Sequence, residues 1–270
     1  MNIKIKMEIK ILTLVIPTKN RFKLLKKILV EIKKFKKEID IIIVDDNSSV
    51  HVSKLIIDLI KEFKNIRYFK LKKNKGQSFA CNYGLKRCKS KYVWFFDDDD
   101  FLKKTTLKTL IHFLYKKDIQ GVLLPMEQVY KGKKFKTVFP KSNDHLFKQL
   151  KNSSQKVSTS CAIFSSKIIR DIGGWDDNLF AGTDTDLFLR FSRVATFNVI
   201  NTYPVIVNFS GPLRVTNNFY RQQNAKIYML KKHWNILTLK RKFYYIISYI
   251  LCFSLLNNIK TKFKILGYKL

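Results

Sequence analysis

Short apolar runs alternate with helix-like apolar stripes through the first hundred residues, and this alternation constrains the fold more than any other feature. Four runs have the length of a buried strand: ILTLVI (11–16), DIIIVD (40–45), IRYFKL (66–71) and KYVWFF (91–96). Between them, leucine, isoleucine and phenylalanine recur every three or four residues, as on one face of a helix. This β–α–β rhythm predicts an α/β fold in which helices flank a mostly parallel sheet.

The rest of the chain continues this pattern without an internal repeat or a linker rich in Gly, Pro or Ser. We expect helices over 103–117 and 187–193 and one ending at Asp171, strands over 121–129 and 157–164, two short strands around Pro204, a turn at 131–134 and a polar segment over 140–156. Asn20 is placed to cap the first helix, and Ser48 or Ser49 the second. We therefore predict one domain over 1–215 and a basic, partly apolar helical segment over 216–270.

Charge is the unusual part of the composition, because 53 Lys and Arg stand against 20 Asp and Glu, a formal net charge of +33. Such a charge is typical of proteins that bind nucleic acid or anionic membranes. Only nine of the 53 are Arg, however, and Arg is the residue favoured for reading bases and clamping phosphates. We therefore expect lysines scattered over solvated faces and no nucleic-acid partner. Asp186 is the last acidic residue, so the chain after it is purely cationic.

The apolar stretch Phe243–Leu256 lies between basic flanks in this cationic part of the chain. At 14 residues it is shorter than a spanning helix needs. Two interpretations remain open: an interfacial anchor on an anionic membrane, or a helix docked on the domain or on another subunit. The four cysteines lack metal-ligand spacing and indicate reduced, packed thiols, and the apolar run ending at Pro17 indicates a first strand rather than a signal peptide.

Polar loops follow three of the expected strands, with the sequences PTKNR, DDNSS and DDDD. Because parallel strands end at one edge of a sheet, these loops converge on one crevice, where ligands bind in open α/β sheets. Four consecutive aspartates after a buried strand repel one another, and they either spread into water or hold a cation. The convergence of the loops favours aspartates that face the crevice.

Five motifs in register resemble the family 2 glycosyltransferases of the GT-A fold. They are LVIPTKNR, IIIVDDNSS, NKGQSFACNYGL, WFFDDDD and GGWDDNLFAGTDTDLFLR, and the resemblance covers about residues 11–215. It implies a Rossmann-like sheet and an inverting enzyme that moves a hexose from a UDP-sugar to a saccharide or lipid-linked glycan in cell-surface glycan synthesis. It also implies a divalent cofactor, Mn²⁺ or Mg²⁺, and work in the cytoplasm, peripherally on the inner face of the membrane.

The resemblance also assigns roles on the donor side of the site. It makes Asp99 the metal ligand and Asp98 the contact to ribose or sugar, with Asp97 flanking the motif, and leaves Asp100 as a solvated residue, a helix cap or a further acidic site residue. The other donor-side residues are Pro17, Thr18 and Arg21 in the first loop, Asp46 against the uracil, and Gly76, which permits close backbone approach. For Asp46 a purely structural role in its turn remains open, and so does a surface role for Arg21.

The general base comes from the GTDTD motif, where the family usually has Glu-Asp-x-Asp and this chain has Thr183 in place of Glu. Asp184 is then the base, with Asp186 as the alternative or as a structural partner of Arg190 four residues later. Trp175 either shapes the sugar pocket or packs in the core. Asn82, in the motif NKGQSFACNYG, braces the loop of that motif.

Two departures weaken the donor-side pattern: Cys81 stands where the family usually has Arg, and VNFSGPLRVT lacks the family's late metal-binding His. Water or Arg214 can take the place of that His. The remaining alternative function is a non-enzymatic basic protein that binds nucleic acid or membrane.

Overall fold

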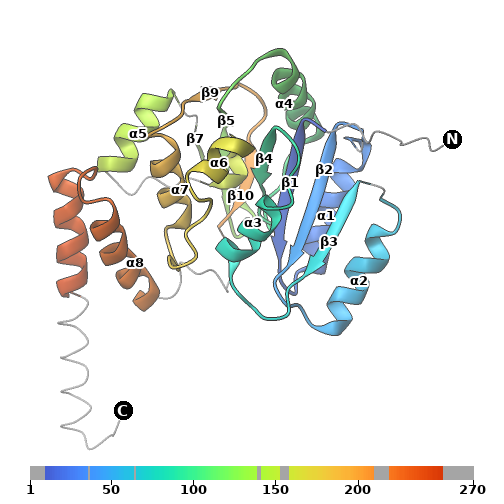
Figure 1. The fold of residues 1–270 in the computed structure, drawn as a ribbon, viewed down its shortest axis with the longest axis horizontal. Coiled ribbons are helices and arrows are strands. Elements are labelled where there is room, and N and C mark those ends of the chain that lie inside the picture. Colours follow the sequence, from blue (N-terminus) through green and yellow to red (C-terminus); the bar gives the residue numbers. More distant parts are fainter. Residues whose placement is uncertain are drawn as a thin grey trace, which may run out of the picture.

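A seven-stranded sheet forms the centre of the protein in the computed structural model, which describes residues 10–35, 37–63, 65–138, 141–152, 158–209 and 219–251 (Figure 1). The strand order is β3-β2-β1-β4-β8-β5-β9. The strands are β1 Leu12–Thr18, β2 Ile39–Asp45, β3 Ile66–Lys70, β4 Tyr92–Phe95, β5 Gly121–Leu123, β8 Ala162–Ser165 and β9 Phe197–Val199. Only β8 runs against its neighbours, so the expected mostly parallel α/β sheet is confirmed.

Helices cover both faces of this sheet because the central strands are apolar on both sides. In β2, Ile41 and Ile43 face one helical layer and Ile42 and Val44 the other. The first layer contains α1 Phe22–Ile32, α2 Val50–Ile60 and α4 Lys104–Lys116. The second contains α3 Gln77–Leu85, α5 Asn143–Asn152, α6 Ser166–Asp171, α7 Thr183–Phe191 and α8 Phe219–Lys232. Two short 3₁₀ helices are also present, η1 Lys33–Phe35 and η2 Thr159–Cys161.

The prediction of a single strand over 121–129 is wrong. This range divides into β5 and β6 Met126–Tyr130, which belong to different sheets. Pro125 lies at the division, where its missing N–H would interrupt a ladder. β6 pairs with β7 Lys133–Val138 and with β10 Val205–Asn208 in a second, three-stranded sheet. The turn expected between β6 and β7 is confirmed, with Lys131 and Gly132 both at positive φ.

Three other boundaries differ from expectation. The polar segment over 140–156 contains the helix α5, whose Leu146 and Leu150 are buried against the core. The strand expected over 157–164 is confined to β8, because η2 precedes it. Asn20 does not cap α1: its side chain accepts the N–H of Ser49, and Ser49 caps α2, which was one of the two expected alternatives.

The C-terminal elements pack on the same core as the sheet. Met229 and Leu230 of α8, and Tyr245 of the helical residues 239–251, belong to the buried cluster that contains Val15 and Phe95. α8 and residues 239–251 lie side by side at the edge of the molecule (Figure 1). In the residues that the structure describes, no helix is both long and apolar enough to cross a bilayer. The last part of the apolar stretch, 252–256, lies outside the described residues, and the domain boundary at 215 stays a prediction.

Candidate active site

The four aspartates after β4 turn partly into the protein rather than out into water. Asp98 and Asp100 are buried, whereas Asp97 and Asp99 keep some exposure. One Asp100 oxygen accepts the N–H of Asn208 at 3.1 Å, which joins the cluster to the end of β10. Asp100 is not a helix cap, because α4 begins only after Lys103. Two of the four aspartates, Asp98 and Asp100, are therefore buried in the protein, and the other two, Asp97 and Asp99, remain partly exposed at the end of β4.

Asp98 is held by Thr18 and Arg21, two of the three candidate residues at the first loop. The Thr18 hydroxyl donates to Asp98 Oδ2 at 2.6 Å, and Arg21 donates to Asp98 Oδ1 at 2.8 Å. The same Arg21 nitrogen lies 3.2 Å from Asp99 Oδ2, so one guanidinium serves two carboxylates. Burial raises the pKa of Asp98 to about 6 even though Arg21 and Thr18 both favour its charged form. Thr18, Arg21, Asp98 and Asp99 therefore form one connected group, while Pro17 is buried within β1.

Asp46 and Gly76 are 30 residues apart and contact each other directly. Asp46 accepts the backbone N–H groups of Lys75 and Gly76 at 2.7 and 2.9 Å, and its own N–H donates to the Thr18 carbonyl at 2.9 Å. Gly76 has φ 89°, a conformation that favours glycine at the start of α3, and no atom of the protein approaches the place of a Cβ. Asp46 thus locks together the loops after β1, β2 and β3.

Asp97 faces the opposite side of the cluster, toward α3 and η2. Gln77 donates to Asp97 Oδ1 at 2.6 Å, and the Asp97 N–H donates to the Ser160 hydroxyl at 3.0 Å. Burial raises the pKa of Asp97 well above its usual range, and the carboxylates of Asp100 and Asp184 raise it further. Gln77 and Ser160 were not among the predicted site residues. In the sequence, only their proximity to Gly76 and to a buried strand pointed to the site.

Asp184 lies in the first turn of α7, because the helix begins at Thr183 rather than at the expected residue 187. Its Oδ2 accepts the N–H of Thr159 at 3.2 Å, and the Thr183 hydroxyl donates to its Oδ1 at 3.4 Å. The next residue of η2, Ser160, accepts the backbone N–H of Asp97, so the short helix η2 contacts both the Asp184 carboxylate and the backbone of the aspartate cluster. Asp184 keeps partial exposure, as a group that must reach a substrate requires.

Asp186, the alternative base, is fully buried on another side of α7. Arg190 binds its Oδ2 through two nitrogens at 2.8 and 2.7 Å, which confirms the expected pair. His233 Nε2 and Lys232 Nζ both lie 2.8 Å from its Oδ1. Although burial opposes it, the hydrogen bond from His233 and the charge of Arg190 hold the pKa of Asp186 below its usual range. A carboxylate with these partners cannot reach an acceptor.

The loop between α6 and α7 is braced from α3 by Asn82, which was expected to brace the loop of its own motif instead. The Asn82 side chain donates to the Trp175 carbonyl and to Asp177 at 2.9 Å each, and accepts the Trp175 N–H at 2.8 Å. A Cβ on Gly174 would lie 2.4 Å from the Asn82 side-chain oxygen, so a glycine is required there. The Trp175 ring is buried and packs edge-on against Phe95 at 5.3 Å, which favours the packing role among its two interpretations.

The carboxylate cluster suits a hard divalent cation that takes few ligands from the protein. No group of three or more His, Cys, Asp and Glu side chains is arranged to hold a metal among the described residues. The crowded carboxylates, with Arg21 as the cation bound to Asp98 and Asp99, and the raised pKa of Asp97, indicate excess negative charge. Oxygen donors of this kind fit Mg²⁺ or Mn²⁺ completed by phosphate oxygens and water. Arg214, the other expected cation, lies outside the described residues.

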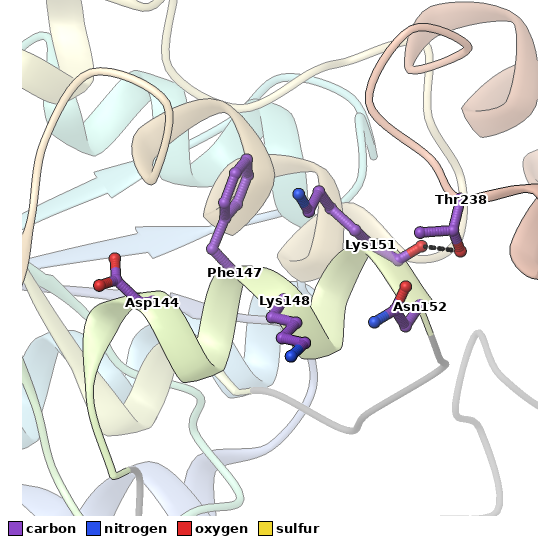
Figure 2. Close-up of a pocket in the computed structure, with 6 residues that line it drawn as sticks. All are labelled: Asp144, Phe147, Lys148, Lys151, Asn152 and Thr238. Atoms are coloured by element: carbon purple, nitrogen blue, oxygen red, sulfur yellow. Dashed lines mark hydrogen bonds between the residues drawn. The ribbon is translucent and has the colours of Figure 1, made fainter.

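A surface groove of about 440 Å³ lies elsewhere, along α5 (Figure 2). Its lining includes Phe147, Lys148 and Lys151, together with Thr238, whose hydroxyl donates to the Lys151 carbonyl at 3.1 Å. None of the candidate site residues lines it. Cys81, Cys88 and Cys161 are buried, as expected for packed cysteines, and the fourth cysteine, Cys252, lies outside the described residues.

Residues 13–173, more than half of the chain, match the model of the glycosyl transferase family 2. The chain therefore belongs to glycosyltransferase family 2. Asp184 and Asp186 follow the matched segment, so their roles depend on the geometry described above.

Two relatives illustrate the range of the similarity. WfaP of Escherichia coli, a UDP-Glc:alpha-D-GlcNAc-diphosphoundecaprenol beta-1,3-glucosyltransferase, is 27% identical over 235 residues, 81% of this chain and 86% of that protein. An uncharacterised glycosyltransferase of Rickettsia conorii is also 27% identical, over 218 residues. That match covers 77% of this chain but only 34% of the longer relative.

Solved structures confirm the expected GT-A fold. Staphylococcus aureus TarS in complex with UDP-GlcNAc has a TM-score of 0.65 at 18% identity, over 81% of this chain and 66% of that one. A mannosyltransferase of Pyrobaculum calidifontis, in complex with GDP-Man and Mn²⁺, has a TM-score of 0.61 at 12% identity, over 85% of this chain and 65% of that one.

Proposed function

We propose that this protein is an inverting glycosyltransferase that moves a hexose from a UDP-sugar to a lipid-linked glycan in cell-surface glycan synthesis. The observation that carries the proposal is that Asp184 and the Asp97–Asp99 cluster both lie beside η2, as two separate carboxylate groups. One group can serve the acceptor while the other serves the leaving diphosphate. Membership in glycosyltransferase family 2 supports the reaction class.

The donor nucleotide is proposed to lie over the interlocked loops after β1, β2 and β3. Asp46 uses its oxygens for two backbone N–H groups, and a carboxylate has about four acceptor positions, so it retains capacity for the N3–H of uracil. Pro17, Thr18 and Gly76 shape the backbone beneath the nucleotide, and Arg21 supplies a positive charge. Asp98 is proposed to contact ribose or sugar, with Asp97 beside it.

Asp99 is proposed to hold the divalent cation, Mn²⁺ or Mg²⁺, because it is the more exposed of the two carboxylates that share Arg21. A bound cation neutralises the charge that develops on a leaving diphosphate. The known complex of the Pyrobaculum calidifontis mannosyltransferase with Mn²⁺ supports a metal on this fold.

Asp184 is proposed to take the proton from the acceptor hydroxyl as that oxygen attacks the anomeric carbon. The new bond joins the acceptor oxygen to the anomeric carbon, and the bond between that carbon and the diphosphate oxygen breaks. UDP leaves with the bonding electron pair, and the proton remains on Asp184. Attack from the face opposite the leaving group inverts the anomeric configuration. The Thr159 N–H, at 3.2 Å from Asp184 Oδ2, fixes the direction of the base.

UDP-glucose and a polyprenyl-diphosphate-linked GlcNAc are the proposed first substrates. WfaP is named for this donor and this acceptor, and it aligns over most of both proteins. TarS has been solved with UDP-GlcNAc, so UDP-GlcNAc is the second donor to test. A donor screen that measures UDP release distinguishes the two.

The enzyme is proposed to work at the inner face of the cytoplasmic membrane, bound through helix 239–251. Tyr245 and Arg241 of this helix are buried, whereas Phe243 is 63% exposed and Ile250 57% exposed. The exposed apolar face consists of Leu239, Phe243, Tyr244, Ile247, Ile250 and Leu251. Lys240 lies beside it, and Lys242 stacks over the exposed Trp234 ring at 4.2 Å. Apolar insertion beside basic residues is typical of peripheral binding to anionic bilayers.

One experiment tests the proposed function against the alternative of a nucleic-acid-binding protein. UDP with Mn²⁺ is expected to raise the melting temperature, and single-stranded DNA at physiological salt is not, because the carboxylate cluster repels a polyanion. Release of UDP from UDP-glucose, dependent on the lipid-linked acceptor, then establishes transfer. Stabilisation by DNA alone would overturn the proposal.

A further inference from the structure

Asp186 joins the base-bearing helix α7 to the end of α8, through Lys232, the last residue of α8, and His233, the residue after it. It lies two residues after Asp184, and its Oδ1 contacts His233 and Lys232 at 2.8 Å each, 46 or more residues further along the chain. The His233 side chain is itself only 2% exposed. A buried carboxylate needs such partners, because an unpaired charge in the interior is unstable. The position of α7 therefore depends on contacts from α8.

Lys232 extends this contact to the loop that precedes α7. Its ammonium lies between Asp186 and Asp176, and the Tyr228 hydroxyl, one turn earlier on α8, donates to Asp176 at 2.9 Å. Arg190 of α7 also donates to the Ile172 carbonyl, at 2.9 Å, where the loop begins. The loop over 172–182 is therefore held from α3, α7 and α8 at once.

These contacts lie on the acceptor side of the site and leave the donor side untouched. Asp184 is carried on the first turn of α7, and its Oδ2 accepts the N–H of Thr159 in η2 at 3.2 Å. A small shift of α7 changes the place of the Asp184 carboxylate, whereas Thr18, Arg21, Asp98 and Asp99 keep their own hydrogen bonds on β1 and β4. Misplacement of a reacting group by about 1 Å can cost about 10²-fold in rate.

We propose that Asp186 and His233 are positioning residues for Asp184, and that α8 is a working part of the catalytic site. The buried pair Asp186 and His233, with Arg190, Lys232 and Asp176 around it, holds both the base and the loop ahead of it. This inference rests on the proposed function, because it takes Asp184 as the base. It adds a dependence of turnover on a helix that follows the family-matched segment.

The test compares His233→Ala with His233→Gln, whose amide can still donate to Asp186. Turnover is measured as UDP release from UDP-glucose with a synthetic polyprenyl-diphosphate-linked GlcNAc, well below the melting temperature of each variant. His233→Ala is expected to lower kcat by about 10- to 100-fold with the KM for UDP-glucose within about twofold, and His233→Gln to restore most of kcat. His112→Ala, on the exposed side of α4, is the matched control and is expected to match wild type.

A second measurement is independent of any substrate. Hydrogen exchange in His233→Ala is expected to speed up over 172–186 and to stay unchanged over 12–21, and Tyr228→Phe, a milder change, is expected to speed it up over 174–178. Wild-type exchange over 172–186 in His233→Ala would overturn the inference, and so would a lower melting temperature with wild-type kcat. If the wild-type protein releases no UDP, the proposed function fails, and the exchange data alone decide whether α8 holds α7.

Discussion

Asp98 and Asp99 follow each other in the chain, yet their surroundings suit different tasks. Asp98 is 4% exposed and accepts hydrogen bonds from Thr18 and Arg21, so its geometry is fixed before any ligand arrives. Asp99 shares only the Arg21 guanidinium and remains more open. A preorganised carboxylate suits a hydrogen bond to a sugar or ribose, and an open one suits a metal ion whose remaining ligands come from solvent and phosphate.

Asp99→Ala is expected to abolish the part of UDP affinity that depends on Mn²⁺, because Asp98 is turned toward Thr18 and cannot replace a direct ligand. Titration calorimetry of UDP with and without Mn²⁺ measures this difference. Asp58→Ala, at an exposed ion pair on α2, is the control and is expected to leave UDP affinity unchanged. Wild-type affinity in the Asp99 variant would remove Asp99 from the metal site.

Asp184→Asn is expected to lower turnover by roughly 10² to 10⁴, the usual contribution of a positioned base, while UDP still binds. The amide keeps the shape of the side chain and can still accept the Thr159 N–H, so the loss comes from basicity rather than from structure. Initial rates and UDP calorimetry on the same preparation check both halves. Normal turnover in this variant would exclude Asp184 as the base.

The elements that sequence reasoning found correctly are those whose pattern is decided locally. β1, β2 and β4 are continuous apolar runs because both faces of each strand are covered, and polar residues follow each of them. α5 could not be found in this way, because it is amphipathic and strongly polar, and its helical state depends on Leu146 and Leu150 packing against the core. The stability of α5 therefore comes from tertiary packing rather than from local helix propensity.

The site was predictable as a set of loops but not as a set of contacts. The link between Asp46 and Gly76 spans 30 residues, and the link between Asp186 and His233 spans 47. No local periodicity encodes such pairs, and His233 appeared in the sequence only as a histidine without a metal-binding neighbour. Thr159 and Ser160 were interpreted as strand, because they directly precede the apolar residues of β8.

Gly84 shows how closely α3 approaches β1. A Cβ at this position would lie 2.4 Å from Val15 Cγ1, and Val15 is fully buried. Gly84→Ala is therefore expected to destabilise the fold by about 1–3 kcal/mol through overpacking, despite the better helix propensity of alanine. Urea unfolding measures the change, with the exposed Lys86→Ala at the end of the same helix as control. A stabilised Gly84→Ala would mean that α3 can move away from β1.

Over the whole molecule, the acidic side chains stop short of the C-terminal part of the chain, where basic side chains continue. The last acidic residue, Asp186, is buried among cations, so the surface contributed by α8 and residues 239–251 contains basic side chains and no carboxylates. The same helix 239–251 is anchored on the domain by Arg241, which donates to the Leu150 carbonyl and to the Tyr245 hydroxyl. One helix thus has a docked face, which agrees with the interpretation of a docked helix, and an exposed apolar face, for which membrane binding is the proposal.

The membrane proposal is tested best on the exposed face alone, because deletion from residue 240 would also remove the buried Arg241 and Tyr245. The combined substitution Phe243→Ser, Ile247→Ser and Ile250→Ser is expected to reduce binding to vesicles of phosphatidylglycerol and phosphatidylcholine by at least about tenfold. The reduction follows because each lost apolar side chain weakens insertion. The lysines still contribute about 1 kcal/mol each to binding. Cosedimentation measures this, and UDP calorimetry confirms an intact donor site. Triple substitution of Tyr115, Tyr130 and Phe135, exposed on other elements, is the control. Equal loss in the control, or none in the test variant, would mean that charge alone brings the protein to the vesicle and that the exposed face of helix 239–251 has another partner.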